Sequence, residues 1–234
     1  MFTKSARFYD AIYGFKDYAA EARMIAKHIK EKVPAADSLL DVACGTGAHL
    51  QHWKLDFRCE GVDIDPNLIS IAHERNPEVA FHEADMEDFD LGKRFDAVTC
   101  MFSSIGYTQS KERLDKGVAT MARHVAPGGV LIVEPWFTPE TYEVGHLGAV
   151  FVDEPELKIA RMNITELEDG LCKMTFHYLV GTPEGFSSFT EDHVVGLFTD
   201  EDYLDAFREV GLTVEHNPWG PMGRGLYTGL KPPD

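Results

Sequence analysis

Apolar and polar positions follow two different periods along the first half of the chain. Short runs of apolar residues, typical of buried strands, alternate with longer segments in which apolar residues recur every three or four positions, typical of helices. The predicted strands are 38–43, 58–62, 79–82, 95–101 and 130–133, and the predicted helices are 17–32, 48–53, 66–75 and 111–124. This alternation predicts an α/β fold with a parallel sheet and helices on both faces, whose ligands bind beyond the carboxyl ends of the strands.

The pattern changes after Pro135. Four β-rich runs follow between residues 149 and 198, and the pairs Asp169-Gly170 and Glu184-Gly185 predict antiparallel hairpins. A helix is expected over 199–210 with Thr199 as its N-cap, and 212–215 and 226–230 are expected to add a hairpin to the main sheet. We therefore expect a single domain over 1–234, with an antiparallel β insertion at about 138–198, after the fifth strand.

The run LLDVACGTG, residues 39–47, joins the first predicted strand to the next helix. Ala43, Gly45 and Gly47 keep side chains out of this turn, so that a ligand can lie directly on backbone N–H groups. The wide glycine spacing of dinucleotide-binding loops is absent. The pattern D-x-A-x-G-x-G, which begins at Asp41, resembles the nucleoside loop of class I S-adenosylmethionine (SAM) methyltransferases.

Acidic residues at the ends of the second and third predicted strands suit the same cofactor. Asp63, in GVDID, is placed to accept both ribose hydroxyls, while Asp65 fits better as the cap of the following helix. Asp85 is placed to accept the adenine amino group, with Met86 over the ring, although its acidic neighbours also fit a solvated loop. The residues expected to bind SAM are Tyr13, Asp41, Ala43, Gly45, Gly47, Asp63, Ile64, Asp85, Met86 and Met101.

A closer resemblance extends over the whole chain. It is carried by FYDAIY, KDYAAEA, LLDVACGTG, LGKRFDAVTCMFSSIGY, APGGVLIVEPWF, HVVGLF and GRGLYTGL. Together these runs resemble the TDP-aminosugar N,N-dimethyltransferases that make the dimethylamino sugars of macrolides. The resemblance implies a Rossmann-like class I methyltransferase fold, a homodimer, and a nucleotide-linked 3-amino sugar as the small-molecule substrate that is methylated twice.

Tyr107, at the end of the SSIGY run, is the candidate catalytic residue. Methyl transfer from a sulfonium requires that the nucleophile be held near the methyl group in a dry site, and an amine needs only to arrive unprotonated. With an ordinary pKa of about 10, a phenol is a weak base at neutral pH, so we expect Tyr107 to orient the amine. The alternative is an aromatic side chain that only packs.

Arg224, between two glycines, is a candidate to bind a substrate pyrophosphate, with a structural ion pair as the alternative. Trp136 could stack on a base or sugar, or belong to the core. Tyr9 and Tyr13, four positions apart on an N-terminal helix, could cover the cofactor or pack inside. The expected substrate-binding residues are Tyr9, Ser104, Trp136, His193 and Arg224.

Composition narrows the partners. The net charge of −17 argues against nucleic acid and anionic membranes, and no apolar run is long enough for a membrane span. Four scattered cysteines suit reduced thiols in the cytoplasm. No metal-binding spacing is present, and His49 and His52 are interpreted as surface histidines. Two alternatives remain: a SAM-dependent methyltransferase of another small amine, hydroxyl or carboxylate, and a SAM-binding protein without activity.

Overall fold

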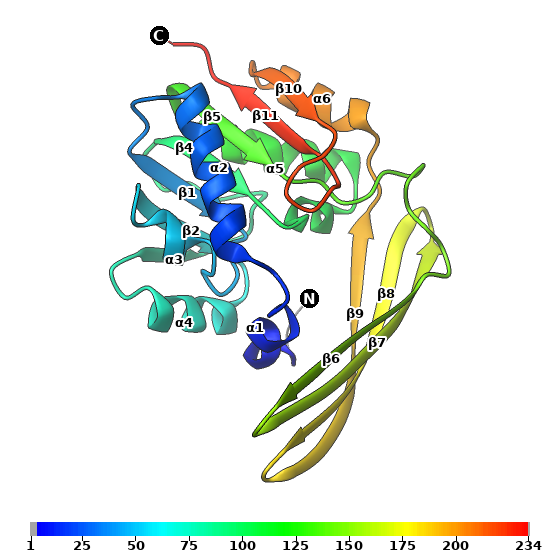
Figure 1. Ribbon diagram of the computed structural model, residues 1–234. Helices are drawn as coiled ribbons and strands as arrows, with labels where there is room; N and C mark the ends of the chain where they lie inside the picture. The colour runs from blue at the N-terminus through cyan, green and yellow to red at the C-terminus, as the bar shows by residue number, and fades with distance from the viewer. Residues whose placement is uncertain (1–3, 234) are drawn as a thin grey trace.

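A seven-stranded sheet in the order β10-β11-β5-β4-β1-β2-β3 forms one half of the molecule in the computed structural model, which describes residues 4–233 (Figure 1). Its parallel strands are β1 (Ser38–Val42), β2 (Arg58–Asp63), β3 (Ala80–Glu83), β4 (Phe95–Cys100) and β5 (Val125–Val133). The hairpin of β10 (Thr213–Asn217) and β11 (Leu226–Leu230) adds to β5 in antiparallel direction. The predicted parallel α/β sheet and its closing hairpin are confirmed.

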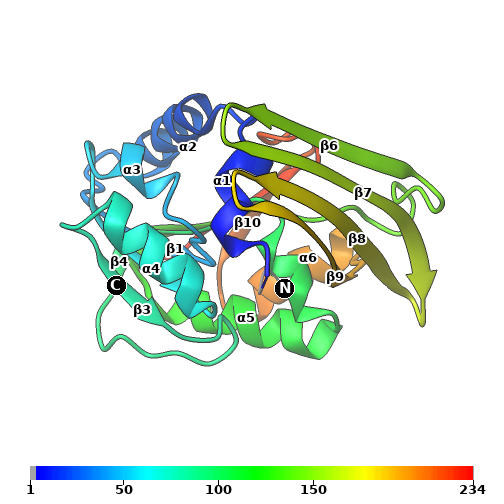
Figure 2. The same cartoon turned by 90° about the horizontal axis from the view of Figure 1, so that it is seen from below.

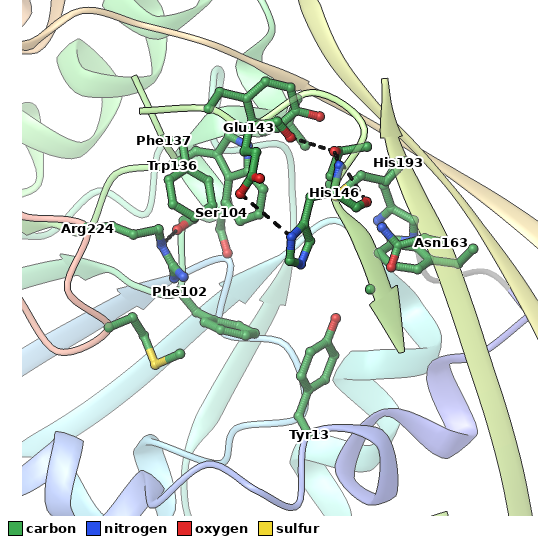
Figure 3. Close-up of a pocket in the computed structure, with 18 of the residues that line it drawn as sticks. Tyr13, Phe102, Ser104, Trp136, Phe137, Glu143, His146, Asn163, His193 and Arg224 are labelled. Atoms are coloured by element: carbon green, nitrogen blue, oxygen red, sulfur yellow. Dashed lines mark hydrogen bonds and ion pairs between the residues drawn. The ribbon is translucent and has the colours of Figure 1, made fainter. Parts of the chain in front are cut away.

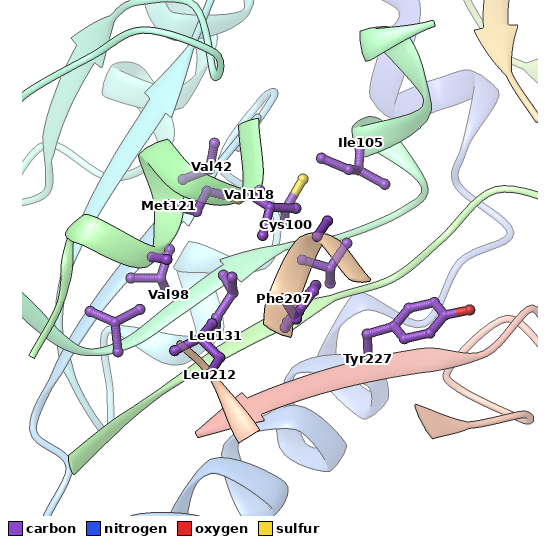
Figure 4. Close-up of a cluster of buried hydrophobic side chains, with 14 of the residues drawn as sticks. Val42, Val98, Cys100, Ile105, Val118, Met121, Leu131, Phe207, Leu212 and Tyr227 are labelled. Carbon is purple, nitrogen blue, oxygen red and sulfur yellow. The ribbon is translucent and has the colours of Figure 1, made fainter. Parts of the chain in front are cut away.

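Side chains of successive strand residues enter two separate cores, one on each face of this sheet. Leu39 of β1 packs with α2 (Tyr18–Lys32) and α3 (Leu50–Trp53), whereas its neighbour Leu40 packs with α5 (Lys111–Arg123) and α6 (Asp200–Glu209). Figure 4 shows the second core, where Val98 and Leu131 of the sheet meet Val118 and Phe207 of these helices. The helix α4 (Pro66–Arg75) packs beside β2 and β3.

The fifth strand begins earlier than the sequence predicts. The run Ala126-Pro127-Gly128-Gly129, read as a turn, lies inside β5. The register shifts there, because Phe95 pairs with Val125 while Ala97 pairs with Val130. Gly128 takes a left-handed φ of 75°, so the extra residues loop out of the strand pairing without ending the strand.

A four-stranded antiparallel sheet forms the other half, in the order β6-β7-β8-β9. Its strands are β6 (Leu147–Glu154), β7 (Leu157–Glu168), β8 (Leu171–Thr182) and β9 (Gly185–Gly196). The hairpins predicted at Asp169-Gly170 and Glu184-Gly185 are confirmed, since β7 pairs with β8 and β8 with β9. The sheet thus lies where the β-rich insertion was expected, between β5 and α6.

The N-terminal segment joins the two halves. It consists of a 3₁₀ turn, η1 (Ala6–Phe8), and the short helix α1 (Tyr9–Ile12), which lies between the sheets in both views (Figures 1 and 2). Phe8, Ile12 and Tyr13 pack with apolar residues of β6 to β9 in one cluster. Within residues 4–233, no helix combines the length and the apolar character that crossing a membrane requires.

Candidate active site

Two small cavities lie at the carboxyl ends of the parallel strands. The first is lined by Asp63, Ile64, Asp85 and Met86, which follow β2 and β3. The second is lined by Asp41, Gly45 and Met101, around the turn after β1. Ala43 lines both cavities, so they are adjoining parts of one elongated site. This is the edge of the sheet where parallel α/β folds bind nucleoside ligands.

The two glycines of the turn after β1 have different roles. Both take a left-handed backbone, with φ of 56° at Gly45 and 68° at Gly47. Gly45 has open space where a side chain would lie, and it lines the second cavity. At Gly47 a Cβ atom would lie only 2.7 Å from Asn76 Nδ2, and this residue lines none of the three cavities described here. The structure therefore places Gly47 against α4, behind the turn.

Two backbone N–H groups hold the carboxylate of Asp63. Gly45 donates to one oxygen at 2.7 Å and Asp65 to the other at 2.9 Å. Burial raises the pKa of Asp63, although these hydrogen bonds oppose the shift. Each oxygen keeps capacity for one more donor, which suits a vicinal diol. Asp65 accepts from the Asn67 N–H at 2.9 Å and caps α4, as the sequence predicts.

Asp41 is a buried carboxyl group at the second cavity. Thr99 Oγ1 donates to it at 2.8 Å. Burial nevertheless raises the pKa of Asp41 to about 7, and the nearby Asp63 adds to the shift. A cation bound in this cavity would stabilise the ionised form.

The interpretation of His49 as a surface residue is wrong. Its side chain is buried, and its Nε2 lies 3.0 Å from a carboxylate oxygen of Glu21, which also pairs with Lys16 at 2.9 Å. The turn after β1 folds back against the start of α2, so His49 lines the second cavity. Burial lowers the pKa of His49, so the ring is neutral at physiological pH. Helical spacing alone could not show this contact between distant elements.

A larger cavity of about 430 Å³ opens between the two sheets (Figure 3). Its volume lies in the range of small-molecule sites. Its lining includes every residue predicted for catalysis or substrate binding, namely Tyr9, Ser104, Tyr107, Trp136, His193 and Arg224. Tyr13, predicted for the cofactor, lies here as well. Tyr9 and Ser104 also line the second small cavity and Tyr107 lines the first, so the large cavity adjoins both.

The Tyr107 hydroxyl is hydrogen-bonded to Nδ1 of His193, at 2.5 Å. Burial raises the pKa of Tyr107 well above its usual value and lowers the pKa of His193 to about 3. At neutral pH the phenol therefore keeps its proton and is hydrogen-bonded to a neutral imidazole. The Tyr107 oxygen can still accept a hydrogen bond from an N–H group, but it is not a base under these conditions.

Arg224 lines the large cavity and also forms an ion pair. Its Nη2 lies 3.4 Å from Glu134, and its Nε donates to Ser103 Oγ at 2.9 Å. Glu134, fully buried, accepts from the Phe102 N–H at 2.7 Å as well. Phe102 and Ser103 are left-handed, with φ of 53° and 62°, so these contacts hold a strained turn after β4. Phe102, Ser103 and Glu134 all lie in motif runs of the sequence, but nothing within those runs shows that they meet Arg224, which is distant in the chain.

Arg161 of β7 is a further cavity residue that sequence reasoning missed. Its side chain is 7 % exposed, and its Nη1 donates to the Tyr13 hydroxyl at 3.1 Å. Strand alternation could have indicated it, because Arg161 shares its face of β7 with the buried Ile159. Over residues 4–233, no three His, Cys, Asp or Glu side chains are grouped so as to hold a metal ion.

Comparison with known proteins identifies the family. Residues 39–129 match the family model described as a methyltransferase domain. Over 229 residues the chain is 43 % identical to dTDP-3-amino-3,6-dideoxy-α-D-glucopyranose N,N-dimethyltransferase of Streptomyces fradiae, an alignment that covers 96 % of this chain and 90 % of the relative. The chain belongs to this family of sugar N,N-dimethyltransferases.

Solved structures of the family have the fold of this methyltransferase. Streptomyces venezuelae DesVI superposes with a TM-score of 0.93 at 41 % identity, covering 98 % of this chain and 99 % of DesVI. SAM-bound CalS10 of Micromonospora echinaspora, an amino pentose methyltransferase of calicheamicin biosynthesis, superposes with a TM-score of 0.88 at 36 % identity and covers 96 % of each chain. The methyltransferase is SAM-dependent, as the glycine turn predicts.

Proposed function

We propose that this methyltransferase transfers methyl groups from SAM to the amino group of a nucleotide-linked (TDP) deoxyaminosugar, and that it does so twice. The observation that carries the proposal is the position of the large cavity. It adjoins both small cavities at Tyr9, Ser104 and Tyr107, so a substrate in it would meet the reactive end of the cofactor. The S. fradiae relative is named for a 3-amino hexose and CalS10 for an amino pentose, which supports an aminosugar as the substrate class.

The residues of the two small cavities fit SAM. Asp63 and Asp85 offer carboxylates for the ribose hydroxyls and the adenine amino group, with Met86 beside the ring. Asp41, whose pKa is raised, suits the ammonium of the methionine end, near Gly45 and Met101. When bound, SAM supplies a methyl group on a sulfonium, which an amine attacks in line.

The chain's own contribution to the reaction is to orient the amine and to exclude water from it. The aromatic rings of Tyr13, Phe102 and Trp136 line the large cavity and limit the access of water to a bound amine. Tyr107, fixed by His193, accepts a hydrogen bond from the amine N–H and directs the nitrogen lone pair toward the methyl group. Since His193 is neutral and Tyr107 protonated, the amine must be unprotonated when it reacts.

Trp136, Tyr9 and Arg224 hold the remainder of the substrate. The Trp136 and Phe137 rings lie 4.9 Å apart and nearly perpendicular, and their faces suit a base or a sugar ring. Arg224 uses Nε and Nη2 on Ser103 and Glu134, and its Nη1 remains for a substrate oxygen. Both features come from the carboxyl-end loops of the main sheet.

Mass spectrometry of the reaction products tests the proposal. The protein is incubated with SAM and a panel of dTDP-linked 3-amino and 4-amino deoxysugars, with the same sugars lacking the nucleotide as controls. We expect at least one nucleotide-linked sugar to gain two methyl groups in succession, while its nucleotide-free counterpart reacts far more slowly. SAM binding without methylation of any panel member would contradict the proposal and favour another acceptor or a purely binding role.

We further infer that the chain works as a homodimer, joined through the outer face of the antiparallel sheet. Five large apolar side chains of this face are 46–75 % exposed: Leu147, Phe151, Met162, Ile164 and Leu179. Strand pairing makes them neighbours, since Phe151 lies opposite Ala160 and Ala160 opposite Leu179. A monomer rarely exposes a contiguous apolar patch of this kind.

The two sheets act as one catalytic domain, because the large cavity takes its lining from both.

The cytoplasm is the proposed compartment. Its support is the state of the cysteines, since all four are free thiols and three of them are buried.

A further inference from the structure

The charges that line the large cavity are unevenly balanced. Among the described residues, its only arginines or lysines are Arg161 and Arg224, which enter from different sheets. Its one lining carboxylate among the described residues, Glu143, lies 3.8 Å from Nδ1 of His146, and both side chains are exposed. His193 is neutral because burial holds its pKa at about 3. The net charge of the cavity lining therefore depends on whether a carboxylate neutralises each arginine.

Arg224 is neutralised within the protein. Glu134 lies 3.4 Å from its guanidinium, and the exposed fractions of the two side chains are 10 % and 0 %. The same guanidinium donates to Ser103 Oγ through Nε. Glu134, its carboxylate partner, also accepts from the Phe102 N–H and so holds the turn after β4. A substrate anion that meets Arg224 therefore meets a charge that is already shared with a buried carboxylate.

Arg161 has no such counter-ion. No carboxylate oxygen of residues 4–233 lies within 4.0 Å of its guanidinium nitrogens, and its buried Nε has no hydrogen-bond partner. The group contacts uncharged side chains: Nη1 donates to the Tyr13 hydroxyl, and the group lies 4.6 Å from the Phe176 ring centroid and 5.2 Å from that of Tyr13. A buried cation without a counter-ion is costly, and aromatic faces compensate only part of that cost.

We propose that Arg161 binds the diphosphate of the nucleotide-linked substrate and supplies the uncompensated positive charge of the large cavity. This inference rests on the proposed function. An anion must approach a chain of net charge −17, so one buried cation that is not already neutralised has a large effect on its binding. The planar guanidinium suits two phosphate oxygens at once. The carboxylate of SAM is a poor candidate for this contact, because Arg161 does not line either small cavity.

Calorimetry with dTDP and with thymidine, in the presence of S-adenosylhomocysteine, separates the diphosphate from the base. We expect Arg161→Gln to weaken dTDP binding about 10- to 100-fold, as for the loss of a charge-assisted bidentate contact, and to change thymidine binding by less than about twofold. Arg161→Lys, which keeps the charge and most of the volume, should fall between the two proteins. Arg208→Gln, the same change at an exposed position on α6, is the matched control and should match the parent.

Three results would overturn the assignment. One is an unchanged dTDP affinity in Arg161→Gln, a second is an equal loss for dTDP and thymidine, which indicates a structural role, and a third is that the parent protein does not bind dTDP. Salt provides an independent check, because dTDP affinity should fall more steeply with ionic strength in the parent than in Arg161→Gln. If the parent binds dTDP through Arg161 but methylates no dTDP-aminosugar, the proposed function fails and the anion site remains.

Discussion

At the scale of single residues, neighbouring side chains of the same type do different work. Asp63 and Asp65 are two positions apart and both buried. The Asp65 carboxylate caps the first turn of α4, whereas the Asp63 carboxylate accepts from backbone N–H groups beside a cavity. Their chemistry is the same, so substitutions at the two positions separate a ligand contact from a structural one.

Asp63→Ala should weaken SAM binding by at least about 30-fold, since a carboxylate that accepts hydroxyl groups contributes about 1.5–3 kcal/mol for each hydrogen bond. Asp65→Ala should lower the free energy of unfolding by about 1 kcal/mol through the lost N-cap and leave SAM affinity within about twofold. Calorimetry and chemical denaturation measure the two effects. Unchanged SAM affinity in Asp63→Ala would refute the ribose contact.

Tyr107→Phe should lower kcat by about 10- to 100-fold, because the hydroxyl that orients the amine is lost. SAM affinity should change little, because the ring that lines the first small cavity is retained. Since the Tyr107 pKa is raised by burial, the variant should lower the rate equally at all pH values. Tyr142→Phe is the matched control in the large cavity, where the hydroxyl donates to the Glu166 carbonyl at 3.1 Å. The disappearance of one limb of the kcat–pH profile would show that Tyr107 acts as a base.

At the scale of elements, the turn from β1 to α3 combines a ligand surface with a packing surface. Gly45 faces the cavity and Gly47 faces α4, although both are left-handed. Asn76, the C-cap of α4, donates to the Gly47 carbonyl at 3.1 Å and fills the space beside it. The turn is therefore held on one side by a helix end and open to a ligand on the other.

Alanine at the two glycines should have opposite patterns of effect. Gly47→Ala should cost about 2–4 kcal/mol of unfolding free energy, the sum of a left-handed alanine and a displaced buried Asn76. Gly45→Ala should cost about 1 kcal/mol, yet it should weaken SAM binding more strongly because its methyl group enters the cavity. Thermal melting and calorimetry on both variants make the comparison. Equal losses of stability would contradict the division of roles.

At the scale of the whole molecule, the antiparallel sheet has two faces with different tasks. Its inner face carries Arg161 and His193 into the large cavity, and its outer face carries the apolar patch. Phe151→Glu should dissociate the proposed dimer, because a charge opposite Ala160 cannot be buried against a second copy. Leu55→Glu, at a position 80 % exposed after α3, is the control. Light scattering after gel filtration measures the mass, and a dimeric Phe151→Glu would refute this interface.

The kinds of element and their order along the chain follow from the sequence alone. Apolar periodicity predicted the parallel strands and their helices, the Asp-Gly and Glu-Gly turns predicted the hairpins, and Thr199 predicted the start of α6. These features depend on residues close together in the chain, where spacing alone carries the physical signal. The resemblance of short motifs identified the cofactor and the family for the same reason.

Which residues meet in space follows from the tertiary structure. It brought Tyr9, Tyr107, His193 and Arg224 to one cavity, packed Gly47 against α4 outside the cavities and buried His49 against Glu21. It also showed that Glu134 neutralises Arg224 while Arg161 has no counter-ion within 4.0 Å in residues 4–233. These facts depend on how two sheets pack across a gap and on strand register between distant segments, and no local pattern in the chain specifies either.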